Sequence, residues 1–187
     1  MLIDGLLDVM PPVRENACVS ADQQATSTGS DHSLLIVGEG EVADALESIA
    51  GALGWRTVVT AERDMALLWL DDAKSVVVLS HHDGVDGPVL AAAVAGSASY
   101  VGAMGSRRTQ ARRRTWMLEN GVETGRVDSV RGPAGLDIGA DTPAEIAVSI
   151  VAEIVARSRG VDGGSISDRE GPIHPGMAPG TAHCPPG

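Results

Sequence analysis

Phenylalanine is missing from all 187 residues, and tryptophan and tyrosine together bring the aromatic content to only 2%. A hydrophobic core cannot be built around large rings, so it must be built from Val, Leu, Ile and Ala. Such side chains are typical of parallel sheets covered by helices. With 43% hydrophobic and 21% charged residues the composition is globular, and the length predicts one domain.

Cysteine is scarce as well, with only Cys18 and Cys184, one near each end of the chain. Their number and spacing exclude a disulfide framework and a zinc site of the CxxC type, as is typical of a reducing compartment. The first ten residues include two aspartates and no basic residue, unlike a secretory signal. No apolar run reaches the roughly 18 residues that a membrane span needs, so we expect a cytoplasmic protein without a span.

Positive charge is also in short supply, and the formal net charge is −11. Nothing in this balance attracts a polyanion, which excludes a general binder of nucleic acid. The basic residues are unevenly placed, because five of the 14 belong to one predicted helix: Arg107, Arg108, Arg112, Arg113 and Arg114. A local positive region of this kind suits a small anion better than a long polymer.

Apolar runs separated by glycine turns and amphipathic stretches predict a Rossmann-like α/β fold, a doubly wound, mainly parallel sheet with helices on both faces. We expect this domain over residues 33–158, a flexible segment over 1–32 and a disordered Gly/Pro-rich tail over 159–187. The predicted strands are Leu34–Val37, Trp55–Val59, Ser75–Leu79, Ala98–Val101 and, more weakly patterned, Arg126–Val130. The predicted helices are Val42–Leu53, Asp64–Leu70, Val89–Ala95, Ser106–Asn120 and Thr142–Arg157.

The first strand ends in a GxGxxA turn that opens a helix. Gly38 permits the tight turn, Gly40 lets a pyrophosphate approach the backbone, and Ala43 allows close packing of helix on strand. Glu39 and Glu41 lie where an anion would pass and oppose tight binding. A Rossmann-like turn that holds no nucleotide is therefore the alternative.

A second glycine turn, Tyr100–Thr109, runs from a strand into the arginine-rich helix. Gly102 and Gly105 allow close approach of a ligand, Ser106 is a candidate N-cap, and the first helical amides point outward with Arg107 and Arg108. This arrangement predicts a phosphate site. The alternative is an ordinary strand-to-helix turn with solvated arginines.

Further candidates lie at the ends of later strands. His81 follows the third strand at the carboxyl edge, where open α/β sheets bind ligands, and a polar contact is expected of it. No third ligand with zinc spacing accompanies His81 and His82, so we expect no metal. Asp137 is the single acid of a glycine-rich loop. Thr142 and Glu145 form a capping box and are interpreted as structural.

Helical periodicity predicts which side chains are buried. Met65, Leu68 and Trp69 are expected on the buried side of their helix. Ala111, Thr115 and Leu118 share one face of the arginine-rich helix, which places Arg108, Arg112 and Arg113 outside. The last helix is apolar over most of its girth, so we expect a homodimer that covers its surplus surface.

The two motifs Tyr100–Thr109 and Gly132–Ser149, in this order and spacing, together with the glycine turn and the strand ending at His81, resemble the Rossmann domain of the XdhC/CoxF/CoxI family. The resemblance covers roughly residues 33–158. It implies an accessory protein that helps to mature a molybdenum-cofactor enzyme such as xanthine dehydrogenase by binding or delivering its pterin cofactor. The chain departs from the family in having Thr60-Ala61-Glu62 in place of Asp-Pro-Arg after the second strand, and no match to the family's cysteine-bearing N-terminal domain.

Three functions therefore compete. The first is the accessory protein, with a molybdopterin-type cofactor and a molybdenum hydroxylase as client. The second is an NAD(P)-dependent oxidoreductase, against which counts the lack of a Tyr-x-x-x-Lys pair, since Tyr100 is the only tyrosine and Lys74 the only lysine. The third is a nucleotide-sensing interaction module.

Overall fold

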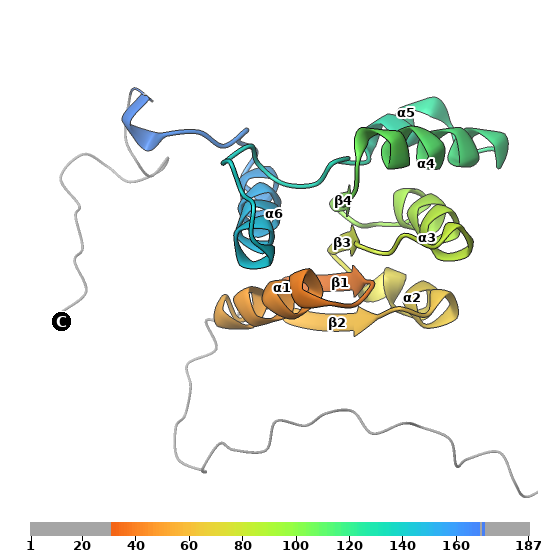
Figure 1. Ribbon diagram of the computed structural model, residues 1–187, viewed down its shortest axis with the longest axis horizontal. Coiled ribbons are helices and arrows are strands. Elements are labelled where there is room, and N and C mark those ends of the chain that lie inside the picture. Colours follow the sequence, from red (N-terminus) through yellow and green to blue (C-terminus); the bar gives the residue numbers. More distant parts are fainter. Residues whose placement is uncertain (1–30, 169, 171–187) are drawn as a thin grey trace, which may run out of the picture.

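The computed structural model describes residues 31–168 and residue 170, so the predictions for 1–30 and for 171–187 lie outside the described residues. Within them, four parallel strands form one sheet in the order β2-β1-β3-β4 (Figure 1). The order reverses beside β1, as in doubly wound sheets, and confirms the predicted fold class. The strands are β1 Ser33–Val37, β2 Arg56–Thr60, β3 Ser75–Val78 and β4 Tyr100–Ala103.

Helices connect the strands and extend beyond β4. They are α1 Glu41–Ala52, α2 Arg63–Trp69, α3 Asp83–Ala95, α4 Arg107–Glu119, α5 Thr124–Ser129 and α6 Pro143–Ser158, with short 3₁₀ turns η1 Leu70–Asp72 and η2 Ile166–Asp168. Helices α1 and α6 cover one face of the sheet, and α2, α3, α4 and α5 lie on the other side (Figure 1). Alternation along the strands sends Leu35 and Val37 to the second face and Leu34 and Ile36 to the first, so the core has two layers.

The last helix begins where the sequence predicts. Thr142 accepts a hydrogen bond from the Glu145 amide, and the Glu145 carboxylate accepts one from the Thr142 amide, which completes the capping box. Pro143 occupies the first turn. Most of the apolar surface of α6 is buried within the chain itself, because the helix packs on α1 and on β4. Val148 and Val155 remain 47% and 39% exposed.

Loop residues that follow α5 cover the outer edge of β4. The Arg131 amide donates to the Val101 carbonyl at 2.9 Å, and the Ala103 amide donates to the Arg131 carbonyl at 2.8 Å. The Ala134 amide then donates to the Ala103 carbonyl at 3.0 Å. These bonds satisfy backbone groups that an edge strand otherwise leaves open.

Three local predictions are wrong. Residues 126–130 are not a strand, because helix α5 occupies Thr124–Ser129 and only Val127 of this helix is buried. Helix α2 buries Ala66, followed by Leu70 just beyond it, while Met65, Leu68 and Trp69 are 42%, 74% and 37% exposed. Because α2 has only seven residues and lies at the border of the sheet, it buries only the narrow face that carries Ala66. The third error, on α4, concerns the site and is described below.

Helix α3 begins at Asp83, earlier than predicted, and contains Pro88. Strand β4 begins at Tyr100 and ends at Ala103, both later than predicted, and includes Gly102. In the part of the chain that the structure describes, no helix is long and apolar enough to cross a membrane.

Candidate functional site

A cleft of about 310 Å³ lies at the carboxyl edge of the sheet. It opens between the turn after β1, the segments after β3 and β4, and the start of α6. This is the position at which doubly wound sheets bind ligands. Its lining residues are Gly38, Glu39, Glu41, Val42, Ala61, Leu79, Ser80, His81, His82, Met104 and Pro143. We call this cleft the crevice.

The two glycines of the first turn have different surroundings. Gly38 has a φ of 135°, and a Cβ there would lie 2.9 Å from the Ser80 amide nitrogen, so this glycine lets the turn pack against the end of β3. Gly40 has a φ of 103°, and a Cβ there would meet nothing within 4 Å. Gly40 is also the N-cap of α1 and makes no side-chain cap. No side chain caps the start of α1, and its first residues, Glu41 and Val42, line the crevice, so its first backbone amides are left for an anion.

Packing and charge act differently on the residues around this helix start. Ala43 is buried against the sheet, which agrees with the packing role that its position in the turn predicts. Glu39 and Glu41 are exposed and line the crevice. Their carboxylates reduce the attraction of the helix start for an anion.

Two histidines form the opposite wall. His81 and His82 are both exposed and both line the crevice, and His82 is the N-cap of α3. The Ser80 hydroxyl accepts a hydrogen bond from the His82 amide at 3.1 Å, which fixes the backbone of this wall. The structure thus brings His81 together with the glycine turn, as the strand order predicts.

The glycines of the second turn serve packing inside the protein. A Cβ at Gly102 would lie 2.7 Å from the ring of Tyr100, and a Cβ at Gly105 would lie 3.2 Å from the side chain of Thr109. Gly105 also has a φ of 135°, which favours glycine. Neither glycine is among the residues that line the crevice.

The start of α4 carries the predicted cap and the predicted cationic pair. The Ser106 hydroxyl accepts a hydrogen bond from the Thr109 amide at 3.2 Å. Arg107 and Arg108 are exposed, and no ion pair within the described residues involves them. Neither arginine is among the residues that line the crevice, although they follow the crevice-lining Met104 by only three and four residues.

Arg113 is the functional-site residue that the sequence analysis placed wrongly. It is not on the outer face of α4, since its side chain is 4% exposed and pairs with Asp86 of α3 at 2.8 Å, a carboxylate that is 2% exposed. The same guanidinium donates to the Met104 carbonyl at 2.6 Å and to the Ser80 carbonyl at 2.7 Å. Ser80 and Met104 both line the crevice, so the hydrogen bonds of Arg113 connect two adjacent walls of the crevice. Ala111 and Thr115, expected inside, are exposed, and Leu118 is 40% exposed.

A second buried polar cluster holds the loop before α6. The Tyr100 hydroxyl donates to the Glu153 carboxylate at 2.7 Å, and the Gly135 amide donates to the same oxygen at 2.8 Å. Burial and then this hydrogen bond raise the pKa of the Tyr100 phenol above its ordinary value. Asp137, two residues beyond Gly135, is exposed and does not line the crevice.

The only tyrosine and the only lysine lie far from the crevice. Tyr100 is the first residue of β4 and pairs in register with Ser75, the residue after Lys74. Both therefore lie at the amino edge of the sheet, and Lys74 pairs there with Asp31. Neither is placed to donate a proton to a ligand in the crevice.

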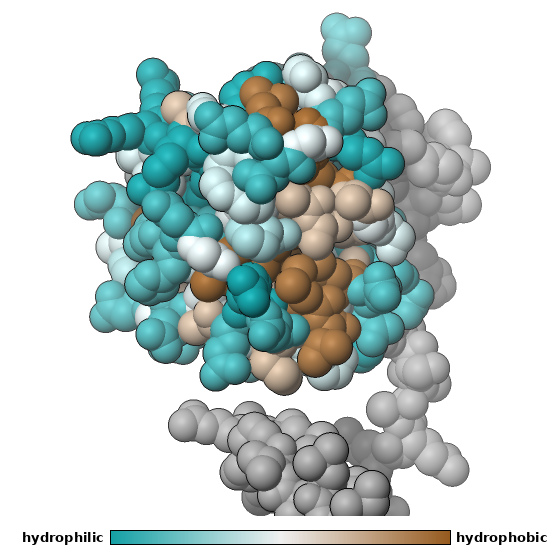
Figure 2. All heavy atoms as spheres, turned by 90° about the vertical axis from the view of Figure 1, so that its right-hand side faces the viewer, coloured by the Kyte–Doolittle hydropathy of each residue, from teal (hydrophilic) through white to brown (hydrophobic). Residues whose placement is uncertain are grey.

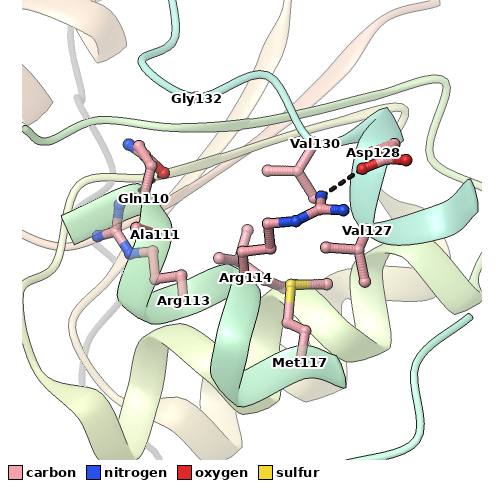
Figure 3. Close-up of a pocket in the computed structure, with 10 residues that line it drawn as sticks. Gln110, Ala111, Arg113, Arg114, Met117, Val127, Asp128, Val130 and Gly132 are labelled. Carbon is pink, nitrogen blue, oxygen red and sulfur yellow. Dashed lines mark hydrogen bonds and ion pairs between the residues drawn. The ribbon is translucent and has the colours of Figure 1, made fainter. Parts of the chain in front are cut away.

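A second hollow, of about 220 Å³, lies between α4, α5 and the segment around Gly132 (Figure 3). Its polar side chains already have partners. Arg114 pairs with Asp128 across the hollow, and the Gln110 amide group donates to the Ala103 carbonyl at 2.8 Å. The crevice, with an open helix start, is the better candidate for a ligand.

The donor set around the crevice can be compared with what each ligand needs. Among the described residues no group of three or more His, Cys, Asp or Glu is placed to hold a metal ion. A nicotinamide dinucleotide usually needs an acid at the tip of the second strand to hold the ribose. Here Ala61 lines the crevice at that point, and Glu62 is the N-cap of α2. The crevice thus fits a phosphate better than it fits an adenosine ribose.

Comparison with known proteins agrees with the fold. The model of the XdhC Rossmann domain family matches residues 34–154. The crystal structure of a xanthine dehydrogenase from Bacillus halodurans is similar, with 27% sequence identity and a TM-score of 0.55 over 69% of this chain. The match spans 43% of that longer chain. No protein of curated function matches. The chain therefore belongs to the XdhC Rossmann domain family.

Proposed function

We propose that this protein is an accessory protein that helps to mature a molybdenum-cofactor enzyme of the xanthine dehydrogenase or CO dehydrogenase type. In this proposal the crevice holds a phosphate-bearing cofactor of the molybdopterin type for delivery to the client. Family membership supports an accessory role of the XdhC type. The observation that carries the proposal is the start of α1, which has no side-chain cap and whose first residues, Glu41 and Val42, line the crevice.

The size of the crevice favours a compact ligand. Its volume of about 310 Å³ lies at the lower end of the range of small-molecule sites, roughly 300–1,000 Å³. A single pterin with one phosphate suits this space better than an extended dinucleotide. Val42, Leu79 and Met104 offer apolar contacts to a flat ring system, and the backbone amides of α1 offer donors to its phosphate.

We assign the cationic side of the site to Arg107 and Arg108. Both arginines are exposed on the first turn of α4, which follows the crevice-lining Met104. A charge-assisted hydrogen bond from arginine to phosphate contributes on the order of 1.5–3 kcal/mol. Glu39 and Glu41 work against it, so the affinity is modest, as handover to a client enzyme requires.

Parallel titrations with molybdopterin and with NAD(P) test this function. The proposal predicts binding of the pterin and a loss of at least about tenfold in affinity when Arg107 and Arg108 are changed to alanine. The matched control changes Arg112 and Arg114, which already pair with Asp83 and Asp128 and should leave affinity unchanged.

The outcomes separate the competing functions. Binding of NAD(P) without the pterin favours a nucleotide-sensing module, and turnover of a nicotinamide cofactor favours an oxidoreductase. If the Arg107/Arg108 variant binds the pterin and activates the client as the parent does, the two arginines are surface charge and play no part in the site. We further propose that the protein acts as a homodimer.

A further inference from the structure

We infer that the homodimer forms through the open border of the sheet, by antiparallel pairing of β2 with β2 of a second copy. This inference rests on the homodimer of the proposed function and not on what the crevice binds. Strand β2 is the lower border of the sheet in Figure 1. The opposite border, β4, is covered by the loop from Arg131 to Ala134, whereas no described segment pairs with the outer edge of β2.

The direction of the backbone groups shows which residues face outward. The Arg56 amide donates to the His32 carbonyl at 3.0 Å, and the Thr60 carbonyl accepts from the Gly38 amide at 2.8 Å, so both residues face β1. Backbone groups alternate in direction along a strand. The amides and carbonyls of Thr57 and Val59 therefore point to the outer edge, where they have no partner within the described residues.

A twofold axis through Val58 pairs these groups. In an antiparallel ladder two opposite residues exchange both of their hydrogen bonds when their backbone groups point toward each other. With Val58 opposite its own copy, each Thr57 lies opposite Val59 of the second copy. Four hydrogen bonds then form across the axis, and all five residues of β2 lie in register.

The charges flanking the strand are complementary under the same symmetry. Arg56 lies opposite Thr60 of the second copy, and the diagonal neighbour two residues further on is Glu62. Arg56 and Glu62 are both exposed, and no described ion pair involves either of them. The axis therefore brings two pairs of opposite charge together, which is what an interface between identical surfaces needs.

An apolar surface next to β2 extends the interface. Four of the seven residues of α2 are exposed hydrophobics: Met65, Leu67, Leu68 and Trp69. Figure 2 shows hydrophobic side chains gathered low on this face, at the height of α2 in Figure 1. Val58 packs toward the same face, and Trp69 and Val58 line one small hollow. A twofold axis normal to the sheet places both copies of α2 on this face, where they cover each other's apolar side chains.

Charge variants of the full chain test the pairing by analytical ultracentrifugation. Arg56→Glu and Glu62→Arg each put like charges together twice, and each should weaken self-association by about tenfold. The two single variants mixed together should form a heterodimer, because each meets its opposite charge in the other. The double variant Arg56→Glu/Glu62→Arg should restore the homodimer. Circular dichroism checks the fold, which these exposed positions should leave intact.

Several results would overturn the inference. A parent chain that stays monomeric removes the homodimer altogether. A dimer that ignores both strand variants but dissociates on Val155→Arg forms through α6, and the homodimer then survives without this interface. Amide exchange provides a second reading, since the Thr57 and Val59 amides should exchange slowly in the dimer and fast on dilution. Protection that does not depend on protein concentration would mean that the chain's own residues cover the edge.

Discussion

Replacing Arg113 by methionine removes a guanidinium that makes four hydrogen bonds to three groups beside the crevice. The side chain donates to the Asp86 carboxylate at 3.0 and 2.8 Å and to the carbonyls of Met104 and Ser80. Methionine fills similar space but leaves the carboxylate of Asp86, 2% exposed, without its counter-charge. Breaking a buried pair in this way costs about 3–5 kcal/mol. For a domain of this size the melting temperature should fall by roughly 10 °C or more.

Thermal and urea unfolding followed by circular dichroism measure this loss. The control is Arg112→Met on the same helix, where the arginine and its partner Asp83 are 52% and 69% exposed and the cost should stay below about 1 kcal/mol. The variant Arg113→Met/Asp86→Leu should recover part of the loss, since no charge is then left buried. If Arg113→Met unfolds as Arg112→Met does, the buried pair is not what holds the crevice walls together.

Three further predictions concern the contacts of β4 and α6. Tyr100→Phe removes a donor to the buried Glu153 carboxylate and should cost about 1–3 kcal/mol in urea unfolding, and an unchanged midpoint would contradict it. Gly102→Ala puts a methyl group against the Tyr100 ring and should cost about 1–3 kcal/mol, with a neutral result refuting the close contact. Backbone amides at the start of α6 hold the pKa of Glu145 below its ordinary value of 4.5. Its stabilisation is therefore full above pH 4.5 and lost as pH falls further, and Glu145→Gln should make stability less dependent on pH in that range than in the parent.

Elements with local signals could be predicted from the sequence. Four apolar runs predict the four strands, and the capping residues Ser106 and Thr142 make the hydrogen bonds that their positions require. Such signals suffice because a cap is satisfied by amides two or three residues away in the chain. Residues 126–130 lack a signal of this kind, and Val127 alone is too little to distinguish a short helix from a strand.

The placement of Arg113 could not be predicted because its reason lies in distant parts of the chain. Helix α4 contains five arginines, and no property of the local sequence distinguishes Arg113 from its neighbours Arg112 and Arg114. Asp86 is 27 residues away, and its carboxylate is matched to this arginine only after α3 and α4 pack together. Met117, the other buried residue of α4, lies four residues further on. An i, i+4 pair of this kind, one charged and one apolar, is invisible to a search for apolar periodicity.

Glycines limit what the sequence can say about the site itself. A glycine is required wherever a backbone approaches something closely, and the sequence does not reveal whether that neighbour is a ligand or the protein. Gly38, Gly102 and Gly105 all face protein atoms, at 2.9, 2.7 and 3.2 Å from where a Cβ would be, whereas Gly40 faces open space. Gly40 still has a φ of 103°, so a side chain there strains the backbone although no atom blocks it. If the crevice binds an anion at the start of α1, Gly40→Ala should weaken ligand binding as well as the fold, whereas Gly102→Ala should weaken the fold alone.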